Sequence, residues 1–250
     1  MKNPWVAVGV LAVVLVGGSI AYAHYVGQKA NEGVEVREHV KGNPDAEVVL
    51  VEYSDFECPA CAAVYPTVSL IMDEYGDQVR FEYRHFPVIN RNPQVLMAAE
   101  AAGQQGKFFE FHDLLFENHP EWSQSRNVDR LLEQYAQELD LDMRLWTQHR
   151  RASLLRSKIQ DDFSQGQADE VGGTPTFFLN DERVELQTHG DLIEAVEEAL
   201  GVEHGTGLRQ ALEMSPEDLD VIDDESGAIE LELDETGVDQ DGDVDFELEF

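Results

Sequence analysis

The chain has 250 residues, of which 42% are hydrophobic, so it is long enough to bury one or two cores. It contains 51 acidic and 17 basic residues, which gives a formal net charge of −34. Such a chain repels nucleic acid and anionic lipid headgroups, so nucleic acid is excluded as a partner and the charge is interpreted as a solubilising acidic surface.

The first expected element is an apolar helix at the N-terminus. No charged residue lies between Lys2 and Lys29, and about 20 apolar residues span a bilayer as a helix. We predict a signal anchor and transmembrane helix over residues 1–25, with the lipid bilayer as a partner and the rest of the chain exported. The alternative is a cleaved signal peptide, because Ala21–Ala23 has the small-x-small pattern of a cleavage site. Residues 26–43 are polar and poorly periodic, which predicts a tether.

A single α/β domain is predicted over residues 44–201. Its first strand is almost wholly apolar or β-branched, as expected for a strand covered on both faces, and its first helix ends at Gly76. A block of about 93–167 has helical spacing almost throughout and predicts an inserted helical domain. The expected order is strand, helix, strand, helical block, strand, strand and helix, with the two short strands meeting in a tight turn at Asn180–Asp181.

Residues 202–250 form an acidic C-terminal extension. They hold 18 acids and one base, Arg209, and therefore carry a formal charge of −17. Apolar and acidic residues alternate strictly in 229–250, which predicts a β-hairpin with one apolar face. This stretch is not an EF-hand: with Gly242 at the sixth position of the loop, the twelfth position would be Leu248, which cannot bind calcium.

The chain has two cysteines, Cys58 and Cys61. Zinc sites take about four ligands, and neither a second CxxC pair nor suitably spaced histidines follow. A structural disulfide is also disfavoured, because closing so short a loop gains little stability. A redox pair fits best: Cys58 begins a helix whose unpaired N–H groups stabilise a thiolate, and one helical turn places Cys61 beside it. No cofactor is expected.

The stretches VEYSDFECPAC, VRFEYRHFPV and GGTPTFFLN, with the helical block, resemble the DsbA-like thiol-disulfide oxidoreductases of the thioredoxin superfamily over about residues 44–200. The resemblance implies a thioredoxin fold with an inserted helical domain. It also implies that Cys58 is the attacking cysteine and Cys61 the resolving one.

The resemblance implies three further site residues. Thr174 and Pro175 would form a cis-proline loop that packs against the disulfide and pairs its backbone with an extended substrate segment. Glu52 would be a buried acid near Cys61 that assists its proton transfer. His85 is interpreted as a packed structural histidine. One position departs from the family pattern: Ala60 stands where well-known DsbA enzymes have histidine, so the oxidising strength is left open.

The function implied is that of an extracytoplasmic, single-pass protein of the bacterial cell membrane. It would donate the Cys58–Cys61 disulfide to reduced cysteines of other exported proteins, and a membrane quinone-linked thiol reoxidase would restore the disulfide. Two alternatives stay open: a reductase or isomerase of the same fold, and a non-catalytic binding module that works through its acidic extension.

Overall fold

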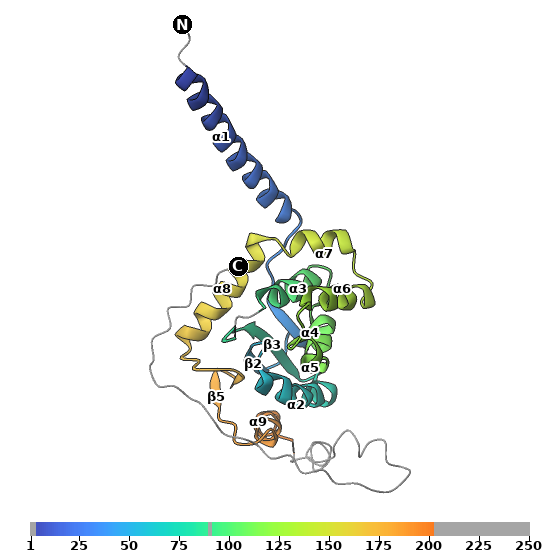
Figure 1. Ribbon diagram of the computed structural model, residues 1–250. Coiled ribbons are helices and arrows are strands. Elements are labelled where there is room, and N and C mark those ends of the chain that lie inside the picture. The colour runs from blue at the N-terminus through green and yellow to red at the C-terminus, as the bar shows by residue number, and fades with distance from the viewer. Residues whose placement is uncertain (1–3, 90–91, 203–250) are drawn as a thin grey trace, which may run out of the picture.

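The computed structural model describes residues 4–89 and 92–202 of the chain (Figure 1). The acidic extension and its expected hairpin at 229–250 lie outside the described residues. The helices are α1 (Pro4–Ala30), α2 (Pro59–Tyr75), α3 (Pro93–Gly103), α4 (Phe108–Glu117), α5 (His119–Trp122), α6 (Val128–Glu138), α7 (Met143–His149), α8 (Ser153–Ala168) and α9 (Gly190–Leu200). The strands are β1 (His39–Gly42), β2 (Val48–Ser54), β3 (Val79–His85), β4 (Thr176–Leu179) and β5 (Glu182–Val184).

The five strands form one mixed sheet in the order β1–β3–β2–β4–β5. Strands β2 and β3 run parallel, with Glu52 beside Tyr83, and the other three pairs are antiparallel. Helices α3 to α8 come between β3 and β4 along the chain, as the helical block predicts. Asn180 and Asp181 both have positive φ in the turn between β4 and β5, which confirms the expected tight turn.

Alternating residues of β2 face two different cores, which explains why the strand is apolar almost throughout. Val48 and Leu50 belong to the main core, together with the buried face of α2. Val51 and Tyr53 point to a second, smaller cluster that includes Phe163 of α8. In Figure 1, helices α3 to α7 gather at one side of the sheet and α8 runs along the other.

The structure differs from the sequence prediction in the segment expected to be a tether. Residues His39–Gly42 within 26–43 form the edge strand β1, which pairs antiparallel with β3. The His39 ring stacks on Phe108 at 3.3 Å between ring centroids, and its Nε2 lies 2.7 Å from Glu100 Oε1. These tertiary contacts stabilise the strand. Its four residues show no periodicity in the sequence, so the strand could not be predicted from the sequence.

The helix expected at the N-terminus is present as α1 and projects from the body of the protein (Figure 1). Among the residues that the structure describes, no helix combines the length and the apolar character that crossing a membrane requires. This finding does not support the transmembrane span predicted for residues 1–25.

Candidate active site

The two cysteines lie where β2 passes into α2. Cys58 is the residue that precedes the first turn of α2, and Pro59 occupies the first helical position, where its missing N–H costs no hydrogen bond. The Cys58 N–H donates to the Asp55 carbonyl at 3.0 Å, which fixes the turn before the helix. Both cysteines are free thiols; Cys58 is 7% exposed and Cys61 is completely buried. Any partner therefore reaches Cys58 first.

The loop before β4 covers the Cys58 sulfur. The Thr174–Pro175 peptide bond is cis, as the resemblance implies. The Thr174 carbonyl accepts a hydrogen bond from the Cys58 thiol, with 3.3 Å between the sulfur and oxygen atoms. Residues 116 positions apart in the chain thus meet at the reactive sulfur.

The surroundings of Cys58 stabilise its thiolate. Its pKa is lowered to about 5, chiefly by a hydrogen bond from the Cys61 thiol, while burial opposes the shift. The Thr174 side chain and the backbone N–H groups of Cys61 and Ala60 lower the pKa further. These N–H groups belong to the first turn of α2, whose positive end favours an anion.

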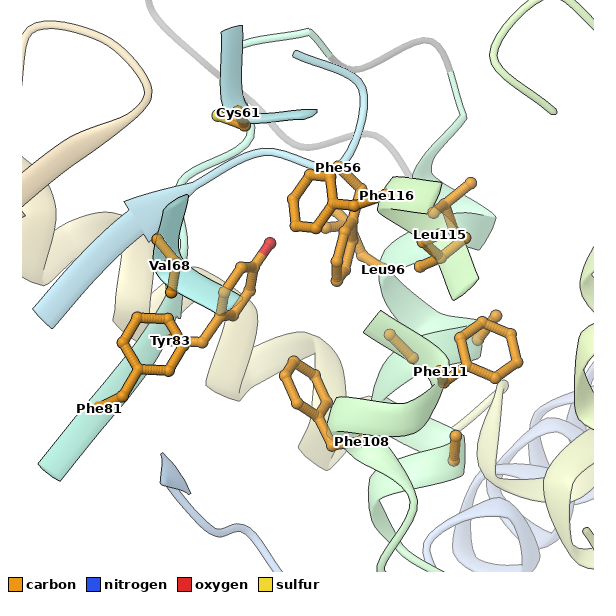
Figure 2. Packing of buried hydrophobic residues seen from close by; sticks show 14 of the residues in the cluster. Phe56, Cys61, Val68, Phe81, Tyr83, Leu96, Phe108, Phe111, Leu115 and Phe116 are labelled. Atoms are coloured by element: carbon orange, nitrogen blue, oxygen red, sulfur yellow. The ribbon is translucent and has the colours of Figure 1, made fainter. Parts of the chain in front are cut away.

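Cys61 is shifted in the opposite direction. Burial raises the pKa of its thiol well above the usual range, and the hydrogen bond to Cys58 and the charge of Glu52 add to this effect. Figure 2 shows Cys61 at one end of the aromatic core, near Phe56, with the Tyr83 hydroxyl pointing toward that end. At neutral pH the site therefore holds one thiolate, on Cys58, and one protonated thiol, on Cys61. The hydrogen bond from Cys58 to the Thr174 carbonyl belongs to the protonated form of Cys58 and is lost when the thiolate forms.

Glu52 is buried beneath the cysteines, as the resemblance implies. It is 3% exposed, and burial raises its pKa to about 7 although the Ser54 side chain lowers it. The charge of Cys58 raises the pKa of Glu52 further, so the thiolate and the carboxyl group interact. A carboxyl group with this pKa is suited to donate or accept a proton near pH 7.

Two acids that the sequence reasoning missed lie in the same loop. The buried Asp55 carboxylate accepts hydrogen bonds from the backbone N–H groups of Glu57, Val88 and Ile89 at 2.7–3.0 Å. Burial raises the pKa of Asp55 to about 7. Glu57 accepts from the Asn92 backbone and side chain at 3.0 and 2.7 Å. These contacts fix the loop that carries Cys58. The signal in the sequence was an acid directly after a buried strand.

One group of described side chains brings possible metal ligands together. The donor atoms of His39, His85 and Glu100 all lie within 4.8 Å of one another, and all three residues are buried. Both histidines contact the same oxygen of Glu100, and the Lys158 ammonium lies 3.8 Å from it. Burial opposes ionisation of Glu100, but His39 and His85 hold its pKa well below the usual range. Because Lys158 already supplies positive charge, we interpret the group as a buried ion-pair network. His85 is completely buried within this network, and its interpretation as a structural histidine stays a prediction.

A family model described as thioredoxin matches residues 35–198. A thioredoxin-like oxidoreductase from Silicibacter pomeroyi is 28% identical with a TM-score of 0.56, over 66% of this chain and 94% of that one. Oxidised BdbD from Bacillus subtilis is 24% identical with a TM-score of 0.56, over 68% of this chain and 95% of that one, which shows the fold alone.

The curated relatives are much longer than the part that matches this chain. Na(+)/H(+) antiporter NhaA 3 of Salinispora tropica is 40% identical over 150 residues, which are 59% of this chain and 22% of the antiporter. The chain spans only 22–27% of the length of these curated relatives. Their names refer to ion transport by the whole proteins, and most of each of these proteins lies outside the matched part.

Proposed function

This chain belongs to the thioredoxin family, and we propose that it is a DsbA-like thiol-disulfide oxidoreductase that donates the Cys58–Cys61 disulfide to cysteine-containing exported proteins. The observation that carries this proposal is the opposite shift of the two thiols: the pKa of Cys58 is lowered to about 5, and that of Cys61 is raised. A stabilised Cys58 thiolate favours the reduced protein, which makes the disulfide a stronger oxidant.

The first step is attack by a substrate thiolate on Cys58 of the oxidised protein. The Cys58–Cys61 bond breaks, a mixed disulfide forms, and Cys61 leaves as a thiolate. Cys61 then takes a proton, for which Glu52 is the proposed donor because its pKa of about 7 keeps it partly protonated at neutral pH.

The second step releases the product. Another substrate thiolate attacks the substrate sulfur of the mixed disulfide, the new substrate disulfide forms, and Cys58 leaves as a thiolate. Its lowered pKa makes it a good leaving group. Two electrons have passed from the two substrate thiols to the cysteine pair. In this proposal Thr174 and Pro175 bind the extended substrate segment beside Cys58, a role favoured by the contact between the Thr174 carbonyl and the Cys58 sulfur.

Cysteine variants test these roles. Cys61→Ser should accumulate mixed disulfides through Cys58, whereas Cys58→Ser should form none. In the reduced wild type, iodoacetamide should modify Cys58 before Cys61 at pH 6, well below the ordinary thiol pKa of about 8.5. Modification of Cys61 first would refute the assignment. Equilibration with glutathione then separates a disulfide donor from a reductase, because a reductase has a lower potential.

We also propose export and attachment to the bacterial cell membrane through residues 1–25, with a quinone-linked thiol reoxidase in the same membrane. The run without charge between Lys2 and Lys29 supports this proposal, and a cleaved signal peptide is the alternative. A membrane-impermeant thiol reagent applied to intact cells should modify Cys58. Mass spectrometry of the mature N-terminus should distinguish an anchor from a cleaved peptide.

A further inference from the structure

Positive charge is concentrated in one part of this acidic chain. Residues 126–158 contain seven bases and five acids, a net charge of +2. The other residues of 1–201 contain nine bases and 28 acids, a net charge of −19. The segment 126–158 includes α6, α7 and the beginning of α8, so the positive charge lies on these inserted helices and on the turns beside them.

Three arginines of this segment line a depression of about 490 Å³ between α3, α6, α7 and α8. We call it the arginine pocket. Its charged lining residues are Arg150, Arg151 and Arg156 together with two acids, Asp129 and Glu133, so the arginines outnumber the carboxylates.

The arginines of the pocket differ in their surroundings. Arg150 is held by an ion pair with Asp129 at 2.5 Å, and its guanidinium lies 4.6 Å from the centre of the Trp146 ring. Arg151 is exposed, and its side chain makes no hydrogen bond or ion pair within the described part of the chain. Arg156 is half-buried in the wall of the same depression. The pocket thus has a fixed guanidinium at one edge and a guanidinium open to solvent beside it.

We propose that the arginine pocket binds the acidic C-terminal extension of the same chain, residues 203–250. The extension carries 18 acids and one base, and the negative charge of most of the remaining chain repels it. Arginine binds carboxylates through two parallel N–H···O hydrogen bonds, so the pocket and the extension are chemically matched.

The covalent connection favours binding within one molecule. The extension follows α9, and a fully extended chain of 48 residues reaches roughly 150 Å, which is longer than any path across a domain of this size. Tethering of this kind gives an effective concentration on the order of millimolar. None of the pocket residues belongs to the proposed catalytic machinery, so this inference is independent of the proposed function.

Hydrogen exchange measured by mass spectrometry on the full chain tests the proposal. At 50 mM salt the backbone amides of the extension should exchange about fivefold more slowly in the wild type than in the double variant Arg151→Glu/Arg156→Glu. This factor is the effect expected from two partly exposed ion pairs. The matched control Arg130→Glu/Arg144→Glu makes the same change of charge at exposed positions outside the pocket and should keep the slow exchange. At 1 M salt, where the screening length falls to about 3 Å, all three proteins should exchange alike.

Three outcomes would overturn the proposal. One is an extension that exchanges equally fast in the wild type and the pocket variant. Another is equal loss of protection in the pocket variant and in the control, which would mean that general charge and not the pocket holds the extension. The third is protection that rises with protein concentration, which would place the extension of a second copy in the pocket. Oxidation of a small dithiol peptide should be unchanged in all variants, which checks that each one is folded.

Discussion

The lowered pKa of Cys58 makes the stability of the reduced protein depend on pH. The pKa of Cys58 is lowered to about 5 in the folded protein, from about 8.5 for an ordinary thiol. A group with a depressed folded pKa contributes its full stability above the unfolded pKa and loses it as the pH falls through the folded pKa. For Cys58 the window therefore runs from about pH 8.5 down to about pH 5.

The size of the effect at pH 7 follows from the same shift. A pH of 7 lies about two units above the pKa of Cys58 in the folded protein. Each unit corresponds to about 1.4 kcal/mol of free energy. The free energy of unfolding of the reduced protein should thus contain about 3 kcal/mol from Cys58 at pH 7 and almost none at pH 4. The same difference corresponds to a reduction potential higher by roughly 60 mV.

Urea unfolding of the reduced protein between pH 4 and pH 8 measures this contribution. The difference in free energy of unfolding between the wild type and Cys58→Ser should grow by about 3 kcal/mol from pH 4 to pH 7. The oxidised wild type is the control, because a disulfide has no thiolate and should lack this pH dependence. A difference between the reduced proteins that stays constant from pH 4 to pH 8 would refute the argument.

Three further changes have defined outcomes. Because the pKa of Glu52 is raised on folding, its contribution to stability is present below about pH 4.5 and is lost as the pH rises through about 7. At pH 9 the Glu52→Gln variant should therefore unfold at a higher temperature than the wild type. Gly166→Ala would place a Cβ atom 2.5 Å from Phe86 Cδ2 and should destabilise the protein by about 1–3 kcal/mol in urea, whereas Gly172→Ala, with no atom within 4 Å, should not. Ala60→His, at an exposed position, should raise the potential measured against glutathione by no more than about 20 mV, since exposed charge interactions contribute at most about 1 kcal/mol.

Local chemistry made much of the candidate site predictable. Pro59 after Cys58 indicates a helix start, and the spacing of Cys61 places it on the apolar face of that helix. Residues with these properties form the same structure in many contexts, so the sequence was sufficient for α2 and for the thiol pair. The cis bond before Pro175 was predicted only through the family resemblance.

Contacts between distant segments explain what the sequence could not predict. Strand β1 depends on the packing of His39 against Phe108, 69 residues later in the chain, and no local sequence pattern predicts this contact. Asp55 looks like an ordinary acid in a loop, yet its carboxylate binds the backbone of Val88 and Ile89. The pairing of Glu57 with Asn92 is of the same kind. Such partners are chosen by the fold and not by the neighbouring residues.

The opposite pKa shifts of the two cysteines favour product formation over substrate release from the proposed mixed disulfide. Cys61 can attack Cys58 and release an unchanged substrate only after losing its proton, and burial raises the pKa of that thiol. Glu52 can accept the proton only when it is ionised, which needs a pH above about 7. A substrate thiolate arriving from solvent meets neither barrier, so at neutral pH the mixed disulfide should proceed to product. Stopped-flow measurement of its decay without a second substrate thiol should show a release rate that rises with pH in the wild type and loses its inflection near pH 7 in Glu52→Gln. An inflection that survives in Glu52→Gln would assign the proton transfer to another group.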